Sequence, residues 1–570
     1  MLLPLFLQAA VHAALLLVVP AAPSLCGDPR ANYDVESYTL DLRVDPRKQR
    51  IEGSVTVEAR ALADELDLLV LDASATLEVR AVVSVEPADS SAPSDHGSKD
   101  VPLAFEHVDD RLECRLPHAI HKGEVLAVRV DYGASPQAVN AFDGFHWDKT
   151  PDGKPWIATS CQSLGAHSWW PCKASFFHPE DKPARLRVNL TVPSGLYAVS
   201  NGRLVERKKT DEDWETFRWR HDYPLATYLV TLNVAPYVAI ESEIELPGVE
   251  GKVPMAWYVL PADEERARKQ FAELPDILAA YSWAFGPWPF PASKVGVVET
   301  PFWGMEHSTA VAYGSSFPAW LAEHGEKDRY AARNRWFDYI LVHEFAHEWW
   351  GNAVTADDWG DFWLHEGFAT YAEGIYVERR DGRAAADKYF AQLARTVPRR
   401  GTLYRGRGSN SGEAYAALLY GKGAMVLDTL RHYVDDDEVW WTSLREFQHR
   451  FRYANARTED FQAVLEETSG REWGRFFAEW VHGNGYPSVH GSVKRTSPGL
   501  VIEVENDPPA PDGFQVPLDL SWIEGEREQA RRVWLEPGQS RLEIPCASPP
   551  RDVRVVHLER VLGKHDVKVE

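Results

Sequence analysis

The hydrophobic residues of this chain change their spacing twice, and this limits the folds open to it. From about Asn32 to Ile240 apolar and polar residues alternate. A period of two is typical of half-buried antiparallel strands. Near Pro261 the spacing becomes helical and continues to His482, and alternation returns in the last part of the chain. We therefore predict an α+β multidomain fold with an N-terminal antiparallel β-sandwich, a mainly helical middle and a small C-terminal β-sandwich.

The length of the chain agrees with several domains. With 570 residues, 44% of them hydrophobic, the chain is too long for one ordinary core and can bury several. We place a signal peptide at residues 1–26, a β domain at 27–245, the helical domain at 246–485 and the C-terminal β-sandwich at 486–570.

The N-terminal segment resembles a secretory signal peptide. The first 25 residues contain no Asp, Glu, Lys or Arg, and an apolar run over 13–19 is followed by small residues and prolines. This predicts export to the periplasm or the extracellular space, with anchoring by the uncleaved segment or by a lipid on Cys26 as alternatives. No later stretch approaches the roughly 20 apolar residues that span a bilayer, so we expect no stable membrane span after this segment.

Net charge and cysteine content exclude two classes of protein. A formal charge of −24 argues against a general nucleic-acid binder, which normally presents a basic face. Five cysteines in a chain of this size do not form a disulfide scaffold. Cys161 and Cys172 are close enough in sequence to bridge in an oxidising compartment, but we favour buried, unbridged thiols.

The motif His343-Glu344-Phe345-Ala346-His347 lies in a segment of helical periodicity. On a helix, residues four apart share a face, so both imidazoles can bind one metal ion while the glutamate reaches a water molecule there. A second helical segment supplies Glu366, nineteen residues after His347. Catalytic zinc takes three protein ligands and keeps one open position. We therefore predict one Zn²⁺ per chain, held by His343, His347 and Glu366.

With these motifs the sequence resembles the aminopeptidase N and leukotriene-hydrolase-like family of zinc metallopeptidases. The segment from Trp303 to His307 is similar to the family's Gly-x-Met-Glu-Asn exopeptidase signature. It differs at both ends, where Trp303 replaces the usual Gly and His307 the usual Asn. The resemblance implies a saddle-like N-terminal domain and a thermolysin-like catalytic domain. We also expect the family's large C-terminal helical domain to be absent, because the sequence ends with the predicted β-sandwich.

The resemblance further implies the residues that bind substrate. Glu306 would pair with the free α-ammonium of a peptide, and Gln162 would be a second ligand for that amine. The backbone of Gly304 and Met305 would hold the peptide as an added strand. These assignments predict peptide substrates with a free N-terminus.

The catalytic residues follow in the same way. Glu344 would act as general base and then general acid. The segment from Tyr420 to Gly423 matches the family's Tyr-x-Lys-Gly pattern, so Tyr420 would stabilise the oxyanion, with nearby Tyr415 as a rival.

The predicted function is zinc-dependent hydrolysis of the N-terminal peptide bond, which makes the chain a metalloaminopeptidase. Three alternatives remain at this stage: a zinc endopeptidase, a bifunctional epoxide hydrolase and aminopeptidase, and a scaffold without catalysis. The oligomeric state and the preferred N-terminal residue have no readable signal in the sequence.

Overall fold

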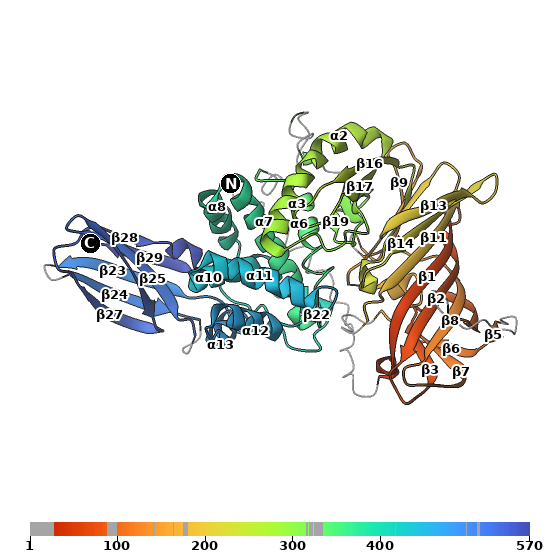
Figure 1. Ribbon diagram of the computed structural model, residues 1–570, viewed down its shortest axis with the longest axis horizontal. Coiled ribbons are helices and arrows are strands. Elements are labelled where there is room, and N and C mark those ends of the chain that lie inside the picture. Colours follow the sequence, from red (N-terminus) through yellow and green to blue (C-terminus); the bar gives the residue numbers. More distant parts are fainter. Residues whose placement is uncertain are drawn as a thin grey trace. The chain divides into compact units, whose positions relative to one another are not determined.

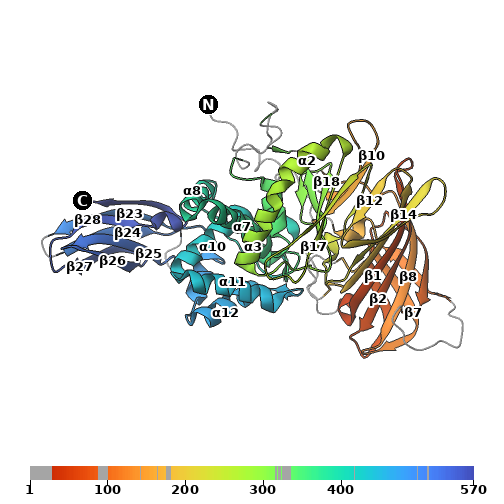
Figure 2. The same ribbon diagram turned by 45° about the horizontal axis from the view of Figure 1, so that its top comes forward.

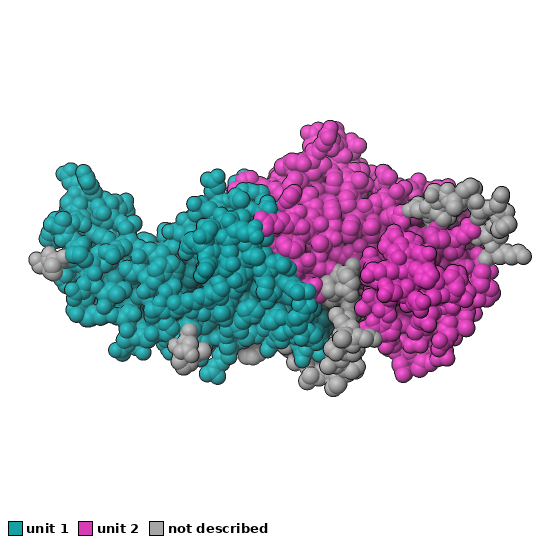
Figure 3. Space-filling model, turned by 60° about the horizontal axis from the view of Figure 1, so that its bottom comes forward, with its two compact units in different colours: residues 1–23, 358–446, 457–570 teal, residues 24–357, 447–456 magenta. Residues whose placement is uncertain are grey.

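The computed structural model describes residues 28–87, 100–140, 143–163, 165–174, 181–314, 317–318, 323, 335–415, 418–496, 499–509 and 513–570. The described residues form two compact units (Figure 3). Unit 1 contains Asp358–Glu446 and Arg457–Glu570, and unit 2 contains the described residues before Asp358 together with Phe447–Ala456. The predicted signal segment lies outside the described residues, and export stays a prediction.

Unit 2 begins with the N-terminal strands, shown in red to yellow in Figure 1. An eight-stranded sheet has the order β13-β14-β11-β1-β2-β8-β4-β5, a four-stranded sheet β12-β15-β10-β9 and a three-stranded sheet β3-β7-β6. Their bounds are β1 Tyr33–Asp45, β2 Arg50–Ala61, β3 Glu65–Asp72, β4 Glu78–Val85, β5 Val101–Pro102, β6 Ala104–Val108, β7 Arg111–His121, β8 Val125–Ala134, β9 Asp143–Lys149, β10 Pro155–Cys161, β11 Arg185–Pro193, β12 Tyr197–Ser200, β13 Arg203–Lys209, β14 Trp214–His221 and β15 Leu232–Ala235.

Alternation along each strand builds the core of these sheets. In β1, Leu40, Leu42 and Val44 are buried, whereas Asp41 and Arg43 between them are exposed. One hydrophobic core contains buried residues from all three sheets. This confirms the predicted N-terminal β-sandwich, with one correction: β1 pairs with β11 in parallel, which is open to these two strands because they are distant in sequence and are not joined by a hairpin.

A second, five-stranded sheet in unit 2 has the order β16-β17-β18-β20-β19, so β19 is an edge strand. The strands are β16 Val238–Ile244, β17 Val253–Val259, β18 Val295–Thr300, β19 Gly304–Met305 and β20 Val311–Gly314. Helices α2 (Glu264–Gln270), α3 (Leu274–Phe285) and α6 (Tyr339–Ala346) accompany it, and Figure 2 shows α2 and α3 beside β17 and β18. The short strands β21 (Thr355–Ala356) and β22 (Asn455–Ala456) pair in parallel.

Helix α6 is shorter than its periodicity predicts. Helical spacing from Arg329 to Trp350 suggested one continuous helix, and residues 329–334 lie outside the described part. The described helix begins only after Asp338, whose extended backbone and side chain, accepting from the Leu341 N–H at 3.1 Å, form its N-cap. Such a cap stabilises a helix start by about 1 kcal/mol. The apolar residues Trp336 and Phe337 therefore precede the helix.

Unit 1 contains helices and the C-terminal strands. Its helices include α7 (Trp363–Asp381), α8 (Arg383–Ala394), α9 (Ser411–Tyr415), α10 (Leu419–Val434), α12 (Thr458–Ser469) and α13 (Gly474–Trp480), and α11 spans Asp437–Phe451. The C-terminal strands form a four-stranded sheet, β27-β24-β23-β29, and a three-stranded sheet, β26-β25-β28. Their bounds are β23 Ser488–Thr496, β24 Gly499–Asp507, β25 Val516–Glu524, β26 Arg527–Leu535, β27 Gly538–Pro545, β28 Arg551–Val556 and β29 Lys564–Val569.

The α+β multidomain class predicted from the sequence is thus confirmed. Cys161 and Cys172 are buried and unbridged, in agreement with the favoured interpretation. Among the described residues, no helix is both long and apolar enough to cross a membrane.

Two glycines determine how closely α7 and α10 pack. A Cβ atom placed on Gly423 would lie 2.6 Å from the Cα of Gly367, and one on Gly367 would lie 3.2 Å from the carbonyl oxygen of Leu419. Both obstacles are backbone atoms, which cannot rotate away. The glycines therefore allow a close approach beside Glu366 on one helix and Tyr420 on the other.

We expect Gly423→Ala to destabilise the protein by about 1–3 kcal/mol, because overpacking forces the two helices apart. Urea unfolding measures this free energy. Gly474→Ala is the matched control, since its Cβ would meet only the Gln462 side chain at 3.6 Å, an ordinary contact. Equal stability of the two variants would contradict the prediction.

Candidate metal centre

The two histidines of the sequence motif converge at the end of α6. His343 lies in the last turn of the helix and His347 is its C-cap residue. Both side chains are buried, and their Nε2 atoms lie 3.3 Å apart. Two ring nitrogens that approach so closely are suited to binding one positive ion between them.

A backbone carbonyl fixes which nitrogen of His347 is available. Its Nδ1 lies 2.8 Å from the carbonyl oxygen of Trp350. Because a carbonyl oxygen only accepts, Nδ1 carries the proton and Nε2 presents its lone pair. This arrangement is typical of metal-binding histidines.

Glu366 completes a set of donors. It lies in the first turn of α7 and is buried. The donor atoms of His343, His347 and Glu366 all lie within 4.8 Å of one another. Two imidazole nitrogens and one carboxylate oxygen are a usual ligand set for catalytic zinc, so the residues present fit the predicted ion.

A second group of donors overlaps the first. Glu306, Glu344 and His347 are buried, and their donor atoms also lie within 4.8 Å of one another. The structure thus brings together the predicted exopeptidase glutamate and the predicted general base.

Gly304 lies directly against Glu344. A Cβ on Gly304 would lie 2.5 Å from Glu344 Oε1, so a larger residue at this position would displace the Glu344 carboxylate. Gly304 and Met305 form β19, the edge strand of the five-stranded sheet. An edge strand offers backbone groups to which an extended peptide can add.

Two side chains from the N-terminal strands bind Glu306. The Gln162 amide donates to Glu306 Oε1 at 2.9 Å, and the Tyr228 hydroxyl donates to the same oxygen at 3.3 Å. Gln162 had been predicted to bind the substrate amine together with Glu306, whereas Tyr228 had not been identified. The chain has 21 tyrosines, and no motif around Tyr228 distinguishes it from the others.

Burial shifts the pKa of two groups close to these residues in sequence. It lowers the pKa of His307 to about 3, so this imidazole is neutral at physiological pH. It raises the pKa of Glu348 to about 7, because lost hydration outweighs the hydrogen bonds that Glu348 accepts.

The predicted oxyanion residue lies in unit 1. Tyr420 is half-buried in the first turn of α10, and two residues later the buried Lys422 donates to the carbonyl oxygens of Gly401 (2.9 Å) and Gly483 (3.2 Å). The rival Tyr415 ends α9, and its ring packs against Trp359 and Phe362.

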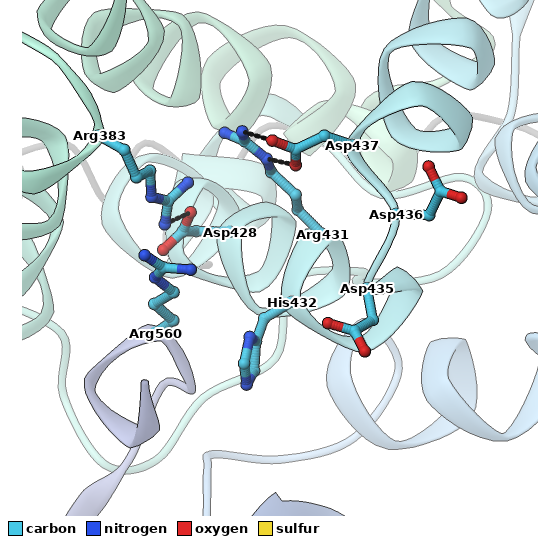
Figure 4. Close-up of a pocket in the computed structure, with 8 residues that line it drawn as sticks. All are labelled: Arg383, Asp428, Arg431, His432, Asp435, Asp436, Asp437 and Arg560. Atoms are coloured by element: carbon cyan, nitrogen blue, oxygen red, sulfur yellow. Dashed lines mark hydrogen bonds and ion pairs between the residues drawn. The ribbon is translucent and has the colours of Figure 1, made fainter. Parts of the chain in front are cut away.

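A cavity of about 230 Å³ in unit 1 has a different character. Figure 4 shows that Arg431 faces Asp437 and Arg383 faces Asp428; each ion pair has a distance of 2.8 Å. The residues that line this cavity are all charged or titratable: Arg383, Asp428, Arg431, His432, Asp435, Asp436, Asp437 and Arg560. None of the predicted site residues lines it, and we interpret it as an ion-pair cluster that joins helices to the C-terminal strands.

Two family models match the chain. The model of the peptidase M1 N-terminal domain matches residues 34–229, and that of the peptidase family M1 domain matches residues 276–480. The second match includes Glu306, Glu344, Glu366 and Tyr420.

Individual relatives carry related names. The chain is 25% identical over 484 residues to aminopeptidase M1 of Arabidopsis thaliana, covering 82% of this chain and 52% of that protein. It is 27% identical over 414 residues to aminopeptidase M1-D of Oryza sativa subsp. japonica, covering 70% and 45%. With leukotriene A-4 hydrolase of Xenopus laevis it shares 24% identity over 518 residues, covering 84% and 75%. The chain spans about half the length of the two plant relatives.

A solved structure shows the same fold. The crystal structure of an M1 zinc metallopeptidase variant from Deinococcus radiodurans, bound to a Tyr-Ser-Ala substrate, superposes with a TM-score of 0.62 at 23% identity. The match covers 79% of this chain and 94% of that one.

We expect Glu366→Gln to lower the zinc content from about one ion per chain to a small fraction, because an amide is a far weaker ligand than a carboxylate. Elemental analysis after dialysis measures this. Glu378→Gln, on the same helix but paired with Arg431, is the control and should retain zinc. Unchanged zinc in Glu366→Gln would contradict the predicted ligand set.

Proposed function

Because the chain belongs to peptidase family M1, we propose that it is a zinc-dependent aminopeptidase that removes the N-terminal residue of peptides. The observation that carries the proposal is the overlap of two donor groups through His347: one would hold the metal, and the other contains Glu306 and Glu344. A metal site alone would support peptide hydrolysis but would not say whether the bond cleaved is terminal or internal. A buried carboxylate beside it supports recognition of a free amine.

His343, His347 and Glu366 would hold the zinc ion. When bound, zinc would polarise the scissile carbonyl and lower the pKa of a water molecule. Glu344 would accept the proton of the attacking water and deliver it to the leaving amine. By its match to the family pattern, Tyr420 would donate a hydrogen bond to the carbonyl oxygen as negative charge develops on it.

Glu306 would measure the length of the substrate from its N-terminus. Its carboxylate is buried, which strengthens an ion pair with the α-ammonium. Gln162 and Tyr228 orient the carboxylate through Oε1. Gly304 and Met305 would pair with the backbone of the peptide at the edge of the sheet.

A panel of aminoacyl-nitroanilides, each free and N-acetylated, tests this function. We expect the free compounds to be hydrolysed far faster than the acetylated ones, activity to be lost after chelation, and activity to recover when zinc is added back. Equal cleavage of acetylated compounds would favour an endopeptidase. Inactivity of the zinc-loaded protein on the whole panel would refute the proposal.

We expect Glu344→Gln to keep zinc but to lose about 10²–10⁴-fold in kcat, the usual contribution of a general acid and base. Stopped assays on the best substrate of the panel, together with elemental analysis, measure both quantities. A variant with wild-type kcat would exclude Glu344 from proton transfer.

We expect Glu306→Ala to lower kcat/KM for free aminoacyl substrates by about 10–100-fold, because a charge-assisted hydrogen bond is worth about 1.5–3 kcal/mol. Most of the loss should be in KM. Activity on N-acetylated substrates should not fall, and an equal loss on both substrate types would assign Glu306 a role other than amine recognition.

A further inference from the structure

Residues Glu306 to Thr309, here called the recognition loop, are fully buried and tied to the end of α6. The loop follows the edge strand β19 and carries the glutamate proposed to bind the substrate amine. Its tethers come from residues that the sequence motifs did not identify.

The first tether is Glu348, the residue directly after His347. Glu348 is fully buried and accepts three hydrogen bonds: from the Thr309 N–H at 2.7 Å, the Asn352 amide at 3.1 Å and the Ser308 hydroxyl at 3.4 Å. Two of the three donors belong to the recognition loop. One buried carboxylate therefore joins the loop to the residue that follows a proposed metal ligand.

The second tether is Asn352, in the turn that ends this helical segment. Its side-chain amide donates to the backbone carbonyl of Glu306 at 2.8 Å and to Glu348 Oε2 at 3.1 Å. Both amide hydrogens are used. Glu348 and Asn352 thus hold the two ends of the loop, at Thr309 and Glu306.

The backbone of Thr309 shows that the tethers constrain the loop. Thr309 has a φ of 57°, in the left-handed region that β-branched residues rarely adopt. It is kept there by the bond from its N–H to Glu348 and by the Gly202 N–H, which donates to its hydroxyl at 2.8 Å. Such strain persists only where the surroundings over-determine the conformation.

We propose that Glu348, together with Asn352, is a positioning residue that sets the distance between the Glu306 carboxylate and the His343–His347 pair. That distance would decide whether a free N-terminus reaches Glu306 while the first peptide bond lies beside Glu344. Glu348 would thereby determine the preference for free over blocked N-termini. This inference rests on the proposed aminopeptidase function.

The test uses the full zinc-loaded chain with Glu348→Ala and Glu348→Gln. We measure zinc content, kcat and KM on the best aminoacyl-nitroanilide, and cleavage of an N-acetylated peptide with an internal quencher. Calorimetry with the corresponding free amino acid and its N-acetyl form gives a readout that does not need turnover.

In Glu348→Ala we expect zinc to stay bound, KM to rise about tenfold or more, and the preference for free over blocked substrates to fall by a similar factor. Binding of the free amino acid should weaken equally. Glu348→Gln should stay within about threefold of wild type, because its carbonyl oxygen still accepts the Thr309 N–H bond.

Glu58→Ala is the matched control. Glu58 is a buried carboxylate of the same unit that accepts from the Ser37 hydroxyl at 2.7 Å and lies on β2. It should lower stability but leave KM and the substrate preference unchanged. If Glu348→Ala does not fold, Asn352→Ala replaces it, because it removes the second tether, the amide bonds to the Glu306 carbonyl and to Glu348, and should cause the same loss of substrate preference.

Two results would overturn the inference while leaving the proposed function intact. One is wild-type KM and substrate preference in Glu348→Ala, or in Asn352→Ala where that variant replaces it. The other is a loss confined to kcat and zinc content, which would make Glu348 a support of the metal site only. Failure of the proposed function itself is seen separately, as inactivity of the zinc-loaded wild type.

Discussion

The burial of negative charge is the constraint on which the centre of unit 2 depends. Glu306, Glu344 and Glu348 are at most 9% exposed, and an unpaired carboxylate in such a place is costly. Each is compensated in a different way. Glu348 receives three hydrogen bonds from the protein, Glu306 receives bonds from Gln162 and Tyr228, and Glu344 lies with Glu306 and His347 in one group of donors. A divalent cation and a substrate ammonium are the charges that such a group is suited to bind.

The buried carboxylates Glu348 and Glu344 have different surroundings, which suit them to different roles. The carboxylate of Glu348 is directed at backbone and side-chain donors of the recognition loop. The carboxylate of Glu344 instead lies against a glycine that leaves room beside it. Glu344 lies on α6 and Glu348 in the turn directly after it, yet Glu348 is suited to hold the loop in place and Glu344 to exchange a proton.

Local patterns in the sequence predicted much of this arrangement. The alternation in β1 and the spacing of His343 and His347 each depend on residues close in sequence, and both predictions agree with the structure. The helical spacing from Arg329 to Trp350 extends beyond the described helix, because apolar residues before Asp338 continue the helical period although the helix begins only after Asp338, its N-cap. Tyr228 and the parallel pairing of β1 with β11 depend on contacts between distant segments, which no local pattern encodes. The bonds that Glu348 and Asn352, in the turns after α6, make to the recognition loop likewise join segments that are distant in sequence.

The edge strand β19 has a further consequence for the behaviour of the protein at high concentration. Open sheet edges invite pairing with other chains and are frequent starting points of aggregation. Here the edge strand is only two residues long, Gly304–Met305. A neighbouring molecule would find too few backbone groups for a stable intermolecular sheet. A short peptide is also held by its terminal charge, so the few backbone groups of β19 are enough to bind it. The short strand therefore favours transient binding of peptides over permanent pairing with another chain.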